Sequence, residues 1–190
     1  MLTVFVNKHK REVHQLLNKM WKNVEFIRKQ LVDRKYSVGP QVYGVENYVS
    51  IDGKLEPTHY HTPEFGFPYG VIGCTLDGLF LVMVVESTSI SEAFLRVVIK
   101  SFPLIQIYGG RDVAHNFYPC PNEEREIFHD IKSSQEEAIQ LDVTITDPWD
   151  RFTKASVQLL DIVEKLVEIA LSHEIKIINP MQSSKYREPR

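Results

Sequence analysis

The sequence predicts one α+β domain, in which a twisted antiparallel sheet of about five to seven strands is covered by N-terminal, middle and C-terminal helices. Apolar residues recur at helical spacing in three segments, and Asp-Gly and Gly-Gly pairs separate apolar runs between them. With 190 residues, of which 43% are hydrophobic and 25% charged, the chain is long enough to bury one substantial core. We expect residues 1–178 to form the domain and the polar residues 179–190 to form a disordered tail.

The first helix is expected over residues 7–35. Its apolar stripe repeats at intervals of three and four and consists of Val13, Leu16, Leu17, Met20, Val24, Ile27 and Leu31. Phe26 does not belong to this stripe, because it projects roughly 140° away from it at 100° per residue. It shares that side of the helix with Lys19 and Lys22. We therefore interpret Phe26, Lys19 and Lys22 as contacts for a partner.

Residues 41–86 change to strand periodicity. The pairs Asp52-Gly53 and Asp77-Gly78 stand between apolar or alternating runs and predict two hairpins, because glycine tolerates the positive φ of two-residue turns. The strand that follows the second turn, residues 79–85, is apolar at every position. This pattern predicts a central strand that is covered on both faces.

A second helix and further strands are expected after residue 86. Ser89 and Glu92 have the spacing of a capping box, and Pro103 stops this helix. A third hairpin is expected to turn at Gly109-Gly110, followed by an acidic connection at residues 119–138 that contains a short helix and whose role the sequence does not define. Alternating apolar residues then predict a half-buried strand, and these are Ile139, Leu141, Val143 and Ile145.

The last helix is expected over residues 149–172 and has an unusually wide apolar arc. Leu160 and Leu171 lie on one flank of this arc, and the polar strip covers only about a third of the circumference. A helix of this kind requires burial on more than one side. We therefore predict a symmetric homodimer and interpret Leu160 and Leu171 as further partner contacts.

The order of elements, helix, antiparallel strands, helix, strands and helix, resembles the type III secretion chaperone fold. The overall pattern is also similar to an uncharacterised family of archaeal proteins of this length. Both resemblances lie in the element order along most of the chain rather than in a motif. They imply a small acidic dimeric domain that binds another protein and catalyses no reaction. From this we predict a non-enzymatic protein-binding or chaperone-like module that uses no cofactor.

An alternative is a metal-dependent enzyme or small-molecule binder that uses His59, His61 and Glu64. On a strand, residues 59 and 61 share a face, and Gly53 followed after five residues by His-x-His is similar to the opening of the first cupin motif. Glu64, however, follows after two intervening residues rather than three or four, and Pro63 is expected to interrupt the strand. We therefore prefer a solvated strand end for these histidines.

A weaker alternative is a nucleic-acid-associated protein. Residues 1–35 hold nine Lys or Arg against three acids, but the whole chain has a net charge of −3, which argues against a dedicated nucleic-acid binder. Cys74 and Cys120 fit neither a disulfide framework nor a metal-binding pair, and the sequence does not define their redox state. We find no leader and no apolar run long enough to cross a membrane, and we expect a cytoplasmic protein.

Overall fold

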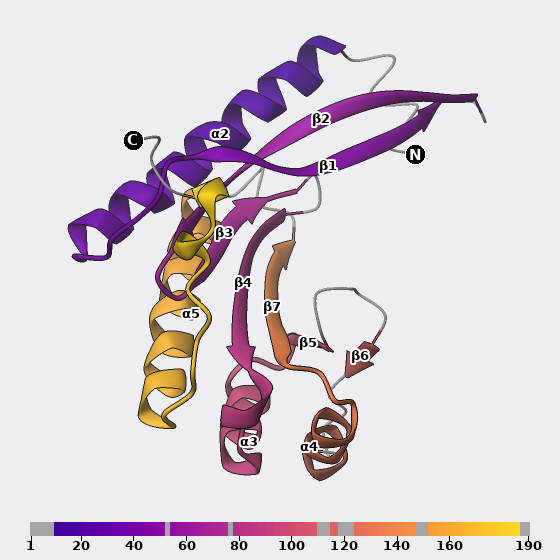
Figure 1. Cartoon of the computed structure of the whole chain (residues 1–190). Coiled ribbons are helices and arrows are strands. Elements are labelled where there is room, and N and C mark those ends of the chain that lie inside the picture. The colour runs from indigo at the N-terminus through magenta and orange to yellow at the C-terminus, as the bar shows by residue number, and fades with distance from the viewer. Residues whose placement is uncertain are drawn as a thin grey trace.

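The computed structural model confirms the predicted α+β fold, with an antiparallel sheet and helices from the N-terminal, middle and C-terminal parts of the chain (Figure 1). It describes residues 10–51, 54–75, 78–109, 115–117, 124–146 and 152–186. The described helices are α2 (Lys10–Asp33), α3 (Glu92–Ser101), α4 (Glu124–Ser133) and α5 (Phe152–Ser172). The described strands are β1 (Val42–Ile51), β2 (Lys54–Phe67), β3 (Gly70–Cys74), β4 (Gly78–Glu86), β5 (Gln106–Gly109), β6 (His115–Phe117) and β7 (Ala138–Thr146).

These seven strands form one sheet in the order β1-β2-β3-β4-β7-β5-β6. Four neighbouring pairs, β1–β2, β2–β3, β3–β4 and β5–β6, are consecutive in the chain, and all of them except β2–β3 correspond to predicted hairpins. Strand β7 crosses back between β4 and β5 and pairs with both of them antiparallel. The position of β7 cannot be deduced from local turn signals, because its partners are far away in the sequence.

The turns differ in detail from the predicted positions. In the first hairpin Ile51 lies opposite Lys54, which agrees with a turn at Asp52-Gly53, although those two residues lie outside the described part. In the second, the Thr75 N–H donates to the Gly78 carbonyl at 2.8 Å, so Gly78 belongs to β4 rather than to the predicted turn, and Asp77 lies outside the described residues. In the third, Gly109 belongs to β5 and lies opposite His115, so it is not part of a two-residue turn as expected, and Gly110 lies outside the described residues.

Gly78 has a structural reason other than the turn. A Cβ atom at this position would lie 2.0 Å from the Ile145 carbonyl oxygen. Only glycine lets the start of β4 approach the end of β7 this closely.

The two faces of the sheet differ in cover. Along β4 the odd-numbered residues, Leu79 to Val85, are fully buried, while the even-numbered Phe80, Val82 and Val84 are only half-buried. This buried row forms one core with buried apolar residues of α2, α3, α4 and α5, so these helices pack on its side of the sheet. The prediction of a central strand is confirmed, but complete cover on both faces is wrong, because Phe80, Val82 and Val84 on the second face are only half-buried.

Helix α5 uses its wide apolar arc within the chain. It contacts α2, α3 and β4, so three elements surround it. Buried residues accordingly extend well beyond one stripe, and Leu160 is 1% exposed and Val167 4% exposed. Burial on more than one side is thus provided by the monomer. The arc therefore gives no separate reason for a dimer.

The segment 175–186, which we call the closing segment, returns from α5 toward β3 and β2 (Figure 1). Strand β3 accompanies β4 only to Val82, and beyond that point the closing segment takes its place. Glu86 N–H donates to the Lys176 carbonyl at 2.9 Å, and Ile178 N–H donates to the Val84 carbonyl at 2.8 Å. The chain then forms two short 3-10 helices, η2 (Pro180–Gln182) and η3 (Ser184–Tyr186).

The closing segment differs from the disordered tail that the sequence predicts from residue 179. Glu64 on β2 is 4% exposed, and its Oε1 atom accepts from the Tyr186 hydroxyl and lies near the Lys185 ammonium, each at 2.6 Å. A Cβ at Gly66 would lie 2.9 Å from Tyr186 Cβ, which leaves room for the tyrosine only beside glycine. A buried carboxylate needs such partners, so Glu64 fixes a segment that looks merely polar in the sequence.

Candidate functional site

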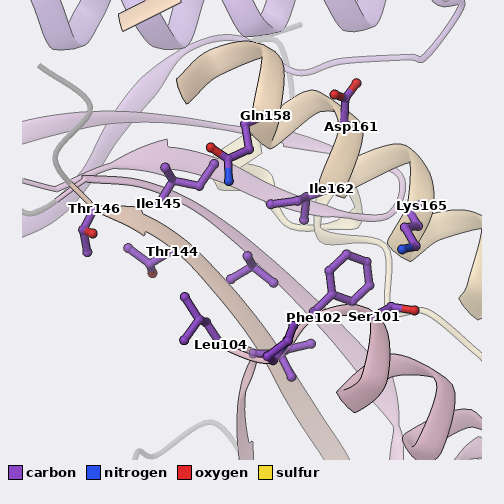
Figure 2. A pocket seen from close by; sticks show the side chains of 13 residues that line it. Ser101, Phe102, Leu104, Thr144, Ile145, Thr146, Gln158, Asp161, Ile162 and Lys165 are labelled. Atoms are coloured by element: carbon purple, nitrogen blue, oxygen red, sulfur yellow. The ribbon is translucent and has the colours of Figure 1, made fainter. Parts of the chain in front are cut away.

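A hollow of about 560 Å³ lies between the end of β7, the first half of α5 and the turn after α3 (Figure 2). Figure 2 shows its side chains, which come from three separate parts of the chain. They are Ser101, Phe102, Pro103, Leu104, Ile105, Val143, Thr144, Ile145, Thr146, Gln158, Asp161, Ile162 and Lys165. A hollow of this size accommodates large side chains of a ligand or a partner.

The floor of the hollow is apolar and belongs to the core. Phe102 is 7% exposed, Ile105 2% and Val143 5%. Leu104, between the first two of these residues, is 82% exposed, more than the other large hydrophobic residues of the described part. Its position follows from a turn in which the Ile105 N–H donates to the Phe102 carbonyl at 2.9 Å. Pro103 presets this turn, and Leu104 projects from its tip.

Helix α5 forms the opposite wall. Gln158, Asp161, Ile162 and Lys165 are spaced by three and four residues, so they share one side of the helix. Ile162 contributes apolar surface, while the Lys165 ammonium lies 5.6 Å from the centre of the Phe102 ring, a cation–π distance. The hollow therefore has an apolar floor and a polar rim on the helix.

The β7 side of the hollow ends in an incomplete sheet edge. The β4–β7 ladder continues to Gly78 and Thr146, whereas the β5–β7 ladder begins only at Gln106 and Asp142. In the part of the chain that the structure describes, residues 143–146 therefore have a strand partner on one side only. We call these four residues the free edge.

The hydrogen bonds of β4 and β7 identify which backbone groups face the free edge. Backbone groups of successive strand residues point to opposite sides of the strand. On β4, Val84 and Glu86 direct theirs to the closing segment, so the odd-numbered residues of β4 face β7. They pair with odd-numbered residues of β7, such as Leu81 with Val143. It follows that Thr144 directs its N–H and C=O away from β4, where no residue of β5 lies opposite it.

Asp142, the last β7 residue with a β5 partner, lies on the same face of the sheet as Val82, its partner on β4. Burial raises the pKa of its carboxyl to about 6, an effect that the hydrogen bond from the Gln140 amide partly offsets. Its Oδ1 atom is buried and has no hydrogen-bond partner among the described residues.

The pKa of the Cys74 thiol is raised above its usual value, first by burial and then by Glu64, so this thiol is held in its neutral form.

The structure separates the partner-contact residues that the sequence predicts. Phe26 and Lys22 do lie together, and with Trp21, Glu25, Lys29 and Gln41 they line a smaller hollow of about 450 Å³ on α2. Lys19 is exposed but does not line that hollow.

The two leucines of α5 also have different environments. Leu160 is buried in the core at 1% exposure, so its predicted role as a partner contact is wrong. Leu171 is 52% exposed near the end of α5, away from both hollows.

The predicted metal site is only partly described. The side chains of His59 and His61 lie outside the described residues, although the backbone of β2 includes both positions. Glu64 is engaged with Tyr186 and Lys185, and β2 continues through Pro63, so the expected interruption at Pro63 is wrong. Within the described ranges, His, Cys, Asp and Glu residues form no group of three that could hold a metal ion.

The acidic connection at residues 119–138 contains the short helix that the sequence predicts, α4. Ile127 and Ile131 are buried, and Arg125 pairs with Glu92 of α3 at 3.2 Å. The described part of this connection is thus attached to α3.

None of the helices that the structure describes is long and apolar enough to span a membrane.

Sequence reasoning missed Leu104, Ile162 and Thr144. The available signal was the string "FPLIQ", in which a proline separates a helix from a strand and an apolar residue follows at the turn. The remaining information is tertiary, because the hollow depends on where β5 begins beside β7.

The chain is similar in sequence and in structure to proteins of unknown function. Residues 15–156 match the family model DUF3201, described as a protein of unknown function. The chain belongs to this family. A solved structure of a conserved hypothetical protein from Pyrococcus furiosus is also similar, with 27% sequence identity and a TM-score of 0.69. The similarity covers 86% of this chain and 98% of the archaeal one. No curated protein matches the sequence.

The match to an uncharacterised family agrees with the coarser of the two sequence resemblances, and the structural relative is archaeal. The matched range includes the turn at Leu104 and the whole of β7, and it ends within the first turns of α5.

Proposed function

We propose that this DUF3201 protein is a non-enzymatic protein-binding module, chaperone-like in that it holds an apolar segment of another protein in the hollow beside β7. The observation that carries the proposal is Leu104, which is 82% exposed next to an apolar floor. Burying such a side chain contributes about 1.5–3 kcal/mol relative to leaving it in water. Leu104 adjoins the apolar lining of the hollow, and a contiguous apolar surface rimmed by polar residues marks an interaction site in many proteins.

The composition of the hollow supports binding of a protein segment. An apolar centre surrounded by a polar rim is the usual anatomy of a protein interface, and here Gln158, Asp161 and Lys165 supply the rim. The hollow on α2, with Phe26 and Lys22, is a second surface available for the same function.

The homodimer predicted from the sequence stays a prediction. Its main motive, the wide apolar arc of α5, is accounted for by contacts with α2, α3 and β4. If the protein does form a dimer, a second copy of the chain is a rival occupant of the hollow. Sedimentation equilibrium measures whether a dimer is present.

The proposal is tested by suppression of aggregation of a heat-unfolded client, citrate synthase, with matched leucine variants. Leu104→Asp places a charge at the hollow, whereas Leu171→Asp places the same charge on an exposed leucine elsewhere. Both positions are exposed, so both variants are expected to fold. We expect wild type and Leu171→Asp to suppress aggregation equally and Leu104→Asp to lose at least about tenfold in effective concentration. No suppression by wild type, or equal suppression by all three proteins, would contradict the proposal.

A further inference from the structure

We propose that the hollow takes its partner by strand addition: a short extended segment of another protein pairs with the free edge at Thr144 and inserts apolar side chains between Leu104 and Ile162. This inference rests on the proposed function and adds the mode of recognition. Neither the family match nor the similar structure assigns such a site.

The first step concerns backbone chemistry. Thr144 directs its N–H and C=O toward the hollow side of β7, and β5 begins two residues too late to pair with them. Of the groups a ligand can offer, the backbone of an extended peptide supplies one acceptor and one donor at the matching spacing. The free edge thus selects a peptide in strand conformation.

The second step concerns side-chain pattern. Side chains of successive strand residues point to opposite faces, and Val143 and Ile145 lie on the face of the helices. A peptide residue opposite Thr144 therefore points to the same face of the sheet as Thr144, away from the core. Its two neighbours, opposite Val143 and Ile145, point toward the hollow. The recognised segment reads apolar, any residue, apolar.

The third step concerns length. The free edge has four residues, 143–146, and the turn at Pro103 and Leu104 leads into β5 at one end of it. A segment that pairs antiparallel with β7 follows the line of β5 and meets this turn. It must end or bend there, so only about three or four of its residues can pair at about 3.3 Å per residue.

The fold already contains the same type of contact. Where β3 stops beside β4, the closing segment supplies two backbone hydrogen bonds, from Glu86 N–H to Lys176 and from Ile178 N–H to Val84. This contact is an isolated bridge rather than a full strand. A segment of three residues is thus sufficient to pair an incomplete edge in this protein.

The occupant is a foreign segment rather than a second copy of β7. If two copies paired through Thr144, the residues next to it would be Val143 and Ile145 of each copy. Val143 is 5% exposed and packs into its own core, so it cannot enter the other hollow. Pairing of two free edges would leave both hollows empty.

The test uses the full chain labelled with ¹⁵N and nine blocked heptapeptides. Each peptide has Leu, Ile or Phe at its third and fifth positions and Ser or Thr elsewhere. We expect at least one peptide to shift the amide resonances of Thr144 and of residues around Leu104, and to slow hydrogen exchange at Thr144. N-methylation of the fourth peptide residue, which removes the N–H that faces Thr144, should weaken binding about tenfold.

The outcomes separate this inference from the proposed function. Equal binding of the methylated and unmethylated peptides, with shifts at Leu104, would overturn strand addition and leave the hollow as a binding site. No peptide binding at millimolar concentration would overturn strand addition, and the Leu104→Asp client assay would then decide alone on the proposed function. Sedimentation at twice the mass of the chain that returns to the mass of one chain in Leu104→Asp, with no peptide effect, would assign the hollow to a second copy and overturn the inference.

Discussion

Two stretches of the sheet are left incomplete by a neighbouring strand that is too short, and the chain treats them differently. At residues 84–86, β3 has ended, and the closing segment pairs with β4 instead. At residues 143–146, β5 has not yet begun, and the described chain offers no substitute. The segment that covers the first stretch is also held at its far end, where Tyr186 and Lys185 contact Glu64. The second stretch lies beside an apolar hollow.

In our proposal, the first incomplete edge serves the fold and the second serves binding. Unpaired strand edges are a liability in soluble proteins, because they pair with other chains. The protein removes this liability at β4 with its own residues and retains it at β7, next to an exposed leucine. The predictions below alter each side of this comparison, from the largest expected effect to the smallest.

The largest effect is expected from a chain that ends after Glu174. It loses the buried Ile175 and both backbone hydrogen bonds to β4, so the free energy of unfolding should fall by about 3–5 kcal/mol. Urea denaturation measures this loss, and the exposed β4 edge should also produce concentration-dependent association. A chain ending at residue 186 is the control, with unchanged stability. Equal stability of both chains would show that the β4 edge needs no cover.

Gly78→Ala should destabilise the protein by about 3 kcal/mol, because the added Cβ would lie 2.0 Å from the Ile145 carbonyl oxygen. It should also displace the end of β7 and weaken peptide binding at the free edge. Gly66→Ala is the matched control, since its Cβ would meet the Tyr186 side chain at 2.9 Å and the closing segment can shift. Thermal denaturation compares the two, and a larger loss for Gly66→Ala would contradict our assignment of Gly78.

Asp142→Asn should stabilise the protein by about 2 kcal/mol at pH 7 and have little effect below pH 4. The pKa of Asp142 rises from 3.8 to about 6 on folding, chiefly through burial, so the native state binds its proton more tightly. Stability of the wild type therefore falls as pH rises between these two values and stays lower above them. Urea denaturation at both pH values provides the measurement. An equal difference at pH 4 and pH 7 would exclude this titration as the cause.

The smallest effect is expected for Tyr186→Phe, at about 1 kcal/mol, because it removes one hydrogen bond to Glu64 and keeps the ring. A double-mutant cycle with Glu64→Gln isolates the pair. We expect the sum of the two single losses in unfolding free energy to exceed the loss measured in the double variant. Strict additivity would mean that the closing segment is fixed by its backbone contacts rather than by Glu64.

Local signals in the sequence predicted most of the fold. Apolar periodicity located α2 and α5, and glycine pairs located the hairpins, because both depend on residues close in sequence. Errors of one or two residues occurred where neighbouring groups compete. Helix α3, for example, begins at Glu92 with Ser91 as its N-cap, since Ser91 accepts from Phe94 N–H at 3.1 Å. Ser89, the predicted cap, accepts from Lys176 N–H of the closing segment instead.

The candidate site was largely not predictable. The local turn at Pro103 projects Leu104, but the hollow beside it depends on the tertiary position of β5, and for the same reason Thr144 has no residue of β5 opposite it. Glu64 was interpreted as a possible metal ligand, because its partner Tyr186 lies 122 positions away in the chain. A single sequence gives local preferences, but it does not show which strand ends before its neighbour does.

The closing segment has a consequence for biosynthesis. The ribosome adds residues 175–186 after all seven strands have been made, so until then any strands that have paired leave the β4 edge open and the Glu64 carboxylate without its partners. Translation at about 5–20 residues per second makes this interval short. The nascent protein nevertheless passes through a stage in which both incomplete edges can recruit a neighbouring chain. Completion of the last dozen described residues ends that stage for one edge only.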